Sequence, residues 1–253
     1  MRKVKGGQHM REPVSKMRKS YIARLALRAA IFVAFVLLYL FYPSFFGVLE
    51  GGRFFTELSP LHLLWVIWMF DMLCQLVPVW KKLPVGSGKL FRGRFRPFRE
   101  TINYEALRNH IIAATRAAYK VFLLWVALLS VIAALYYTDL IAKEHLFLIS
   151  VCFYVCDLIW VLIWCPFRLI MKNRCCTTCR IFNWDHLMML SPMVFMGGFF
   201  SVSLILVAIA VFLLWETCIL MYPERFWEQS NAALQCAECT DKLCTQYCRK
   251  LRK

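Results

Sequence analysis

"LMMLSPMVFMGGFFSVSLILVAIAVFLLWETCIL", residues 187–220, is an apolar run of 34 residues without a Lys or Arg. A single helix of that length would extend about 51 Å, whereas the hydrocarbon core of a bilayer is only about 30 Å thick. Gly197 and Gly198 interrupt the run, and a pair of glycines lets a helix turn back at little steric cost. Two folds remain open: one tilted span with a glycine packing surface, or a short helix over about 183–196 followed by a full helix over about 199–220.

The composition predicts an integral membrane protein. Hydrophobic residues make up 60% of the 253 positions, and the mean hydropathy of +0.56 is well above that of soluble domains. Most of the apolar runs have the roughly 17–25 residues that a membrane-spanning helix needs. The first run is not expected to be a signal peptide, because it follows 28 mainly polar and basic residues and lacks a cleavage site. The apolar runs are 29–49, 60–80, 121–138, 146–167 and 187–220.

The distribution of positive charge favours the second fold. Lys and Arg mark the cytoplasmic loops of membrane proteins. With six spans and a cytoplasmic N-terminus, 29 of the 31 lysines and arginines lie inside, and only Arg53 and Lys143 lie outside. With five spans the tail would lie outside and the number inside would fall to 23 of 31. The sequence therefore predicts an all-α protein of the cytoplasmic membrane, with about six transmembrane helices in three hairpins, a short fifth helix and both termini in the cytoplasm.

This topology divides the chain into seven segments. Two Cys-rich segments, a loop and the tail, flank the third hairpin on the cytoplasmic side. Thr101 is expected to cap an amphipathic helix that leads into the third span. The segments are a basic arm (1–28), a first hairpin (29–80), a basic loop with the amphipathic helix (81–120), a second hairpin (121–167), a Cys-rich loop (168–182), a third hairpin (183–220) and a Cys-rich tail (221–253).

Three acids, Asp71, Asp157 and Glu216, lie deep in the apolar runs. Each precedes the next cationic residue by nine to eleven positions, which places it about 14–17 Å from the basic edge, near the middle of the bilayer. No Lys or Arg is expected at that depth, so the predicted partners are polar neighbours such as Gln75, Ser130 and Thr217. Two interpretations stay open: a shared cation or proton site, or protonated acids that hydrogen-bond between helices.

Seven of the twelve cysteines flank the third hairpin. Two Cys-x-x-Cys pairs, Cys176/Cys179 and Cys236/Cys239, supply the four thiolates of a tetrahedral structural zinc site. In a reducing cytoplasm such spacing indicates metal or redox chemistry more often than disulfides. Further ligands are available in Cys175, Cys244, Cys248 and His186.

Other uses of these cysteines stay open beside zinc. The tail spacing Cys-x₂-Cys-x₄-Cys-x₃-Cys resembles a ferredoxin run without matching it, and seven thiols exceed what one zinc ion needs. An iron–sulfur cluster is therefore the first alternative, and free thiols without metal are the second. His186 could ligate the metal or hydrogen-bond to a ligand, but a lone His at a helix start is more often a capping or interface residue.

The stretch "KKLPVGSGKLFRGRFRPFR", residues 81–99, has seven Lys or Arg, three Phe and no acid. Basic residues beside a cytoplasmic leaflet attract anionic lipid headgroups, and Phe inserts at the interface. Nucleic acid is the less favoured partner, because the loop is attached to a membrane. The expected lipid contacts are Lys81, Lys82, Lys89, Arg92, Arg94, Arg96 and Arg99.

Three classes of function follow. The chain contains no Walker loop, dinucleotide fingerprint, zinc-protease helix or nucleophile elbow, so an enzyme is not favoured. The first class is a scaffold or regulator in which zinc ties the Cys-rich loop to the tail. The second is a small cation or proton transporter that uses the three acids, and the third is an electron-transfer protein with an iron–sulfur centre. The thiolate spacing is the more specific signal and favours the first class.

Overall fold

The computed structural model describes most of the chain as helix. The described residues form no β-strand, and one isolated β-bridge joins Pro97 to Asn231. The described residues are 16–76, 95–97, 102–172, 179–235, 238 and 243.

Four helices are long and apolar enough to cross a membrane. They are α1 (Lys16–Phe41), α4 (Tyr104–Tyr137), α5 (Lys143–Leu162) and α8 (Gly198–Met221). A fifth apolar helix, α2 (Leu61–Leu76), has 16 residues. The protein is thus all-helical, as expected, and consistent with a multi-pass membrane protein.

Short helices connect and extend the long ones. The 3₁₀ helices η1 and η2 follow α1, the short helix α6 follows α5, and η4, α7 and η5 form one irregular segment before α8. Their bounds are η1 (Pro43–Leu49), η2 (Arg53–Phe55), α6 (Phe167–Met171), η4 (Arg180–Trp184), α7 (Asp185–Leu190), η5 (Ser191–Phe195), η6 (Pro223–Phe226) and η7 (Ala232–Leu234).

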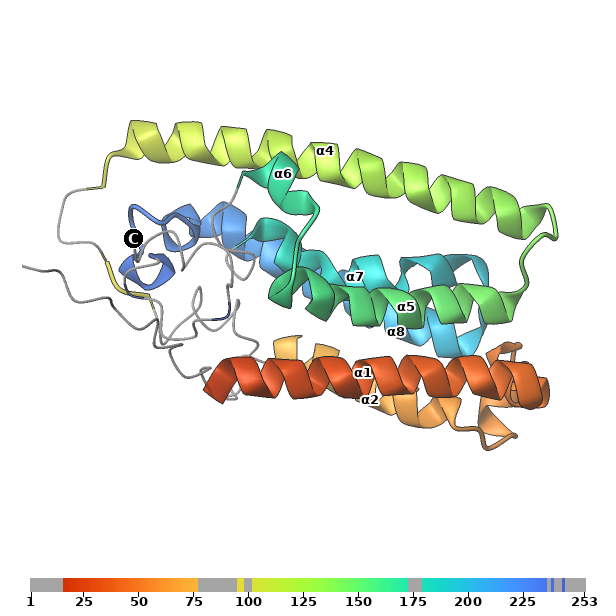
Figure 1. The fold of residues 1–253 in the computed structure, drawn as a ribbon. Helices are drawn as coiled ribbons and strands as arrows, with labels where there is room; N and C mark the ends of the chain where they lie inside the picture. The colour runs from red at the N-terminus through yellow and green to blue at the C-terminus, as the bar shows by residue number, and fades with distance from the viewer. Residues whose placement is uncertain are drawn as a thin grey trace, which may run out of the picture.

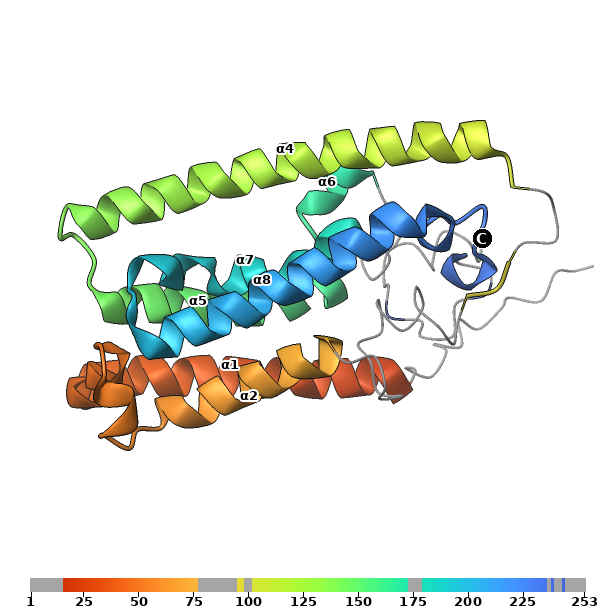
Figure 2. The same cartoon turned by 180° about the vertical axis from the view of Figure 1, so that it is seen from behind.

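The long helices lie side by side in an elongated bundle (Figure 1, Figure 2). Helices α1 and α2 form one side, α5, α7 and α8 lie in the middle, and α4 forms the opposite side. Contacts are most extensive between α1 and α5 and between α2 and α8, while α4 packs on α6 and η5. We call the end where α1 and α4 begin and α8 ends the basic end, and the opposite end the far end.

Aromatic side chains fill the centre of the bundle. Trp68, Phe46, Phe147 and Phe200 are buried, and Phe147 makes edge contacts with Phe46 and Phe200 at centroid distances of 5.7 and 5.9 Å. Such perpendicular ring pairs add to the stabilisation from buried apolar area. This core joins α2, η1, α5 and α8, so it fixes the far end of the bundle.

The outer surfaces of the long helices are apolar. Large hydrophobic side chains are exposed along α1, α4 and α8, including Leu40, Leu123, Val131 and Leu206. Exposed hydrophobic residues in such continuous rows are unusual for a protein in water, whereas they are expected where a helix faces lipid tails.

The break at Gly197 and Gly198 is confirmed, and a single helix over 187–220 is wrong. Both glycines have positive φ, +67° and +79°, and α8 begins at Gly198. The segment before them is less regular than the helix expected over 183–196. Only α7 is α-helical, and η5 begins at Ser191 with Pro192 in its first turn, where proline has no N–H to continue the α-helix.

Two helix starts differ from the expected ones. Helix α1 begins at Lys16, so Arg28 lies in the middle of a helix and not at the edge of a span. The amphipathic helix and the third apolar run form one continuous helix, α4. Its N-cap is Asn103, whose side chain accepts a hydrogen bond from Ala106 N at 3.1 Å. The expected cap, Thr101, lies outside the described residues.

The turn at Gly198 predicts a clear effect of substitution. A Cβ atom there would lie 3.0 Å from Leu49 O and 3.4 Å from Gly51 N, in a backbone conformation that disfavours side chains. Gly198→Val is expected to lower stability by about 1–3 kcal/mol, measured as thermal unfolding of the purified protein in detergent. Gly52→Ala is the control, since Gly52 has φ −88° and open space around it. An unchanged melting temperature for Gly198→Val would contradict this turn.

Candidate functional site

The three acids do not meet in one site; each contacts a basic side chain from another segment. Asp157 pairs with Arg28 and Glu216 pairs with Arg180. The expectation that no Lys or Arg lies at their depth is therefore wrong. It failed because Arg28 lies within α1, and because the irregular segment that follows Cys179 places Arg180 beside α8.

Arg28 of α1 joins the first helix to α5. Its Nη1 donates to Asp157 Oδ2 at 2.8 Å and to the backbone oxygen of Tyr154 at 2.8 Å. The guanidinium also lies over the Tyr154 ring, 3.8 Å from its centroid. The side chains of Arg28 and Asp157 are only 14% and 21% exposed. A charge-assisted hydrogen bond and a cation–π contact thus hold the same cation.

Arg180 joins η4 to α8 and α4. Its Nε lies 3.1 Å from both carboxylate oxygens of Glu216, and its Nη2 also donates to Oε2. Trp184 Nε1 donates to Glu216 Oε1 at 2.7 Å, and Arg180 Nη1 donates to Thr115 at 2.9 Å. Glu216 is therefore a neutralised and hydrogen-bonded acid, not a bare carboxylate.

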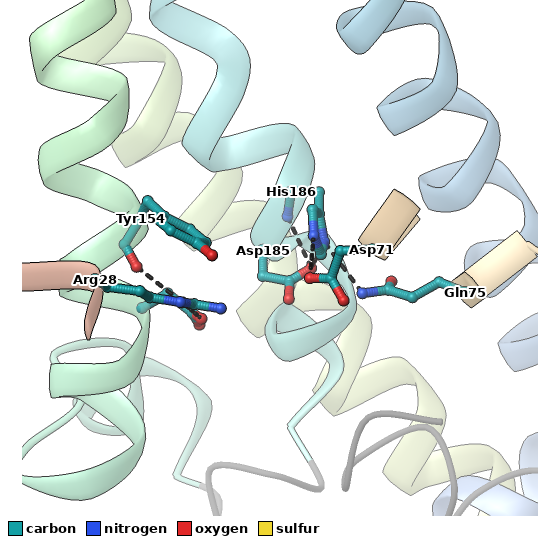
Figure 3. A network of polar contacts seen from close by, with 7 residues as sticks. Arg28, Asp71, Gln75, Tyr154, Asp185 and His186 are labelled. Carbon is teal, nitrogen blue, oxygen red and sulfur yellow. Dashed lines mark hydrogen bonds and ion pairs between the residues drawn. The ribbon is translucent and has the colours of Figure 1, made fainter. Parts of the chain in front are cut away.

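His186 lies between two carboxylates, and we call this group the Asp71–His186–Asp185 triad. His186 Nδ1 is 2.9 Å from Asp185 Oδ1, and His186 Nε2 is 3.1 Å from Asp71 Oδ2 (Figure 3). The side chains of His186 and Asp185 are 7% and 17% exposed, whereas that of Asp71 is 45% exposed. The triad is thus enclosed at the imidazole and open at Asp71.

When both ring nitrogens bond to the carboxylates, the triad holds two protons. They are present as an imidazolium between two carboxylates, or as a neutral imidazole with one protonated carboxyl group. Either arrangement carries one net negative charge. Loss of one proton leaves lone pairs of nitrogen and oxygen facing each other and adds a second negative charge. The geometry of the triad therefore defines a place where a proton is bound.

Gln75 can donate a hydrogen bond to His186 Nδ1 when this nitrogen carries no proton. Its Nε2 lies 3.2 Å from His186 Nδ1. When Nδ1 is protonated it donates to Asp185, and when it is unprotonated it accepts from the Gln75 amide. Gln75, predicted as a polar partner of the midplane acids, thus contacts the imidazole that binds Asp71.

The triad and the Arg28–Asp157 pair are neighbours. Figure 3 shows Asp185 between the Arg28 guanidinium and His186. Three carboxylates, from Asp71, Asp157 and Asp185, are thereby served by one arginine and one histidine. Within the contacting side chains acids outnumber bases, which favours the binding of a proton, and Arg24 of α1 adds a more distant positive charge that acts on Asp71.

Most of the predicted metal ligands lie outside the described residues, namely Cys175, Cys176, Cys236, Cys239, Cys244 and Cys248. Cys179 is described and buried, in a cluster with Ile181 and Trp184. His186, proposed as a further ligand, has both ring nitrogens in the triad. Within the described part of the chain, no three His, Cys, Asp or Glu side chains are arranged to hold a metal ion.

Of the predicted lipid contacts, only Arg96 is described. Its side chain reaches Glu238 at 3.4 Å, and its backbone oxygen accepts from Ala232 N at 2.9 Å. This part of the basic loop therefore lies against the tail. The other expected contacts, Lys81, Lys82, Lys89, Arg92, Arg94 and Arg99, lie outside the described residues.

Sequence reasoning missed Arg28, Arg180 and Asp185 as site residues. Arg28 stands directly before the first apolar run, which hides its position inside a longer helix. Asp185 and His186 belong to "NWDH", two consecutive titratable residues at the start of an apolar run. That pairing is the signal that could have identified the triad.

No known protein family, curated protein or solved structure matches this chain. The chemistry of the described residues is therefore the basis of the functional conclusion.

The Arg180–Glu216 pair gives a test of how the acids stabilise the bundle. Glu216→Gln leaves Arg180 buried without its counter-charge and is expected to lower stability by about 3–5 kcal/mol, read from thermal unfolding in detergent. Glu57→Gln is the control and should change stability by less than about 1 kcal/mol, because Glu57 and its partner Arg53 are 48% and 56% exposed.

The pairing also predicts recovery in a double variant. Arg180→Met with Glu216→Leu removes both charges and should restore most of the stability lost in Glu216→Gln, since neither charge remains alone. If Glu216→Gln is as stable as the wild type, the acid is a protonated hydrogen-bond donor and the ion pair is wrong.

Proposed function

We propose that this chain is a small proton transporter that crosses the cytoplasmic membrane six times, with both termini in the cytoplasm. The observation that carries the proposal is the Asp71–His186–Asp185 triad, in which one ring nitrogen has an acceptor for its protonated state and a donor for its unprotonated state. Ionisable groups within membrane-spanning segments are costly and mark proton or ion pathways.

Six crossings are supported by the lengths and directions of the segments. Besides the four long helices, α2 packs along α8, and the segment from η4 to η5 packs along α5 and α8. Helix α2 is about 24 Å long at 1.5 Å per residue, enough for most of a bilayer core with slight thinning. Helix α1 begins and α8 ends at the basic end (Figure 1). Because consecutive crossings alternate in direction, this arrangement requires an even number of crossings, which six satisfies.

The orientation follows from the charges at the two ends. At the far end, Arg53 and Lys143 both contact Glu50, at 3.7 and 3.9 Å. The basic end carries the first turns of α1, with Lys16, Arg18 and Lys19. The positive-inside rule then places the basic end in the cytoplasm, beside anionic headgroups.

In this account the ion pairs and the triad have different roles. The Arg28–Asp157 and Arg180–Glu216 pairs are fixed connections between helices, because each acid is neutralised by a hydrogen-bonded cation. The triad is the part that exchanges a proton. When His186 Nδ1 loses its proton, it can still accept a hydrogen bond from Gln75. Asp71, the exposed member, is the point where a proton enters or leaves.

Proton flux tests this function. Wild-type protein reconstituted in liposomes is expected to carry protons down an imposed pH gradient, monitored with a pH-sensitive dye inside the vesicles. His186→Gln should reduce the flux to background, because glutamine hydrogen-bonds but does not titrate. His62→Gln is the matched control, since His62 bonds to Ser59 and Phe54 outside the triad.

Two results would contradict the function. One is wild-type flux in His186→Gln at an equal amount of folded protein. The other is an inactive wild type under gradients of protons, Na⁺, K⁺ and Mg²⁺.

A second candidate function is a metal-tied scaffold or regulator, in which Cys176, Cys179, Cys236 and Cys239 hold one zinc ion. It is supported by the packing of the tail. Leu243, four residues after Cys239, is 4% exposed in a cluster that Phe182 contacts. Phe182 follows Cys179 by three residues, so the chain near both Cys pairs approaches one place at the basic end.

Metal analysis of the purified protein tests the scaffold. One zinc ion per chain is expected, and Cys236→Ser should lose it, because three thiolates hold zinc poorly. Cys74→Ser is the control, since Cys74 is a free cysteine within α2 and belongs to neither Cys-x-x-Cys pair. If the purified protein is coloured and contains iron, the site holds an iron–sulfur cluster and not zinc. If Cys236→Ser keeps its zinc, the two Cys pairs do not share a metal site.

A further inference from the structure

Two fully buried side chains in the middle of the bundle carry polar atoms that make no hydrogen bond to any described residue. Ser150 of α5 is completely enclosed, and its hydroxyl group has no partner. Trp68 of α2 is equally enclosed, and its indole N–H has no acceptor. Leaving a buried polar atom unbonded is costly, so nearly all such atoms in proteins bond to protein or to an ordered water molecule.

The two side chains lie beside each other. The centroid of the Trp68 ring is 6.1 Å from that of Phe147 and 5.7 Å from that of Tyr154. Phe147 and Tyr154 are about two turns apart on α5, and Ser150 lies between them, about one turn from each. The indole reaches from α2 to both rings, so it covers the face of α5 that Ser150 occupies.

The hydrogen-bonding capacity of the two groups matches that of one water molecule. An indole N–H only donates, whereas a serine hydroxyl both donates and accepts. Trp68 and Ser150 do not bond to each other directly. A water molecule between them accepts from the indole and exchanges a hydrogen bond with the hydroxyl, which provides the two polar partners that a buried water needs.

This position lies between the acids and the far end of the bundle. Helices α2 and α5 both begin at the far end and run toward the basic end (Figure 1). Trp68 precedes Asp71 by three residues on α2, and Ser150 precedes Asp157 by seven on α5. At 1.5 Å per residue these separations are about 4.5 and 10.5 Å along the helix axes. The site is thus about one helical turn from the triad, on its far-end side.

We propose that Trp68 and Ser150 hold a buried water molecule that relays the proton between the triad and the far end. The relay rests on the proposed function, whereas the water site itself does not. The water accepts a proton from the side of the triad and releases one of its own toward the far end, so its composition is unchanged. Trp68 and Ser150 are positioning residues in this step.

The surroundings of the site explain why a water molecule is needed there. Phe46, Phe147 and Phe200 form the aromatic core at the far end. Such side chains neither accept nor donate a proton, so a proton that leaves the triad in this direction requires another carrier. A water fixed by two side chains provides that carrier one turn from Asp71.

Solid-state NMR tests the water site independently of transport. Magnetisation is transferred from water to the indole N–H groups of the full-length protein in bilayers, and the Trp68 signal is identified by its loss in Trp68→Phe. We expect transfer to this buried indole, and its loss in Ser150→Ala. Ser130→Ala is the matched control, because the Ser130 hydroxyl on α4 bonds to Val126 O. Absence of transfer to Trp68 in the wild type, or undiminished transfer in Ser150→Ala, overturns the site.

Thermal unfolding in detergent supplies a second test, in which Ser150→Ala is made in the wild type and in Trp68→Phe. In the wild type we expect a lower melting temperature, because the water is lost and the indole is left without a partner. In Trp68→Phe the same change should have little effect, since the water is already lost. A higher melting temperature for Ser150→Ala in the wild type would mean that the hydroxyl has no partner at all. That result, or an equal decrease in both backgrounds, overturns the shared water.

Proton flux in liposomes tests the relay. Ser150→Ala is expected to reduce the flux about tenfold, roughly the factor that corresponds to one lost hydrogen bond. The nitrogen spectrum of His186 should stay unchanged, and Ser130→Ala should keep wild-type flux. Wild-type flux in Ser150→Ala overturns the relay.

The outcomes separate this inference from the proposed function. Proton flux in the wild type without water at Trp68 overturns the inference and leaves proton transport intact. Water at Trp68 that Ser150→Ala removes, in a wild type that carries no protons, supports the site and overturns the relay together with the proposed function.

Discussion

A carboxylate in an apolar helix bundle needs a partner, and this constraint organises the protein. The cost of an unpaired buried charge exceeds that of most other defects in a structure. Asp157 is served by Arg28 from α1, Glu216 by Arg180 from η4, and Asp71 by His186 from α7. Each contact joins segments far apart in the sequence, so the acids help to hold α1 against α5, η4 against α8 and α2 against α7.

The triad differs from the two arginine pairs because histidine can give up its proton. Arginine stays charged at any accessible pH, so its pairs are permanent. His186 instead has two carboxylates and an amide around one imidazole. The permanent pairs fix the helices, while the triad contains a titratable group, and this difference underlies the proposed function.

The sequence predicted the helical class and the break in the last apolar run, because both depend on patterns of apolar residues and glycines. It also identified Asp71, Asp157 and Glu216 as unusual, since charge in an apolar run is visible without a structure. It did not predict their partners. Arg28 appeared to mark a helix edge although α1 begins at Lys16, and such helix starts depend on tertiary contacts that composition does not encode. Arg180 reaches Glu216 only because η4 is irregular.

Nitrogen NMR of His186 tests the central claim most directly. Spectra of protein labelled with ¹⁵N-histidine in bilayers, with His186→Gln subtracted, isolate one of the five histidines. The account predicts that both ring nitrogens of His186 are hydrogen-bonded, with a proton that exchanges between bound and released states as the pH is changed. A neutral imidazole with one nitrogen free of any hydrogen bond at every pH would contradict it.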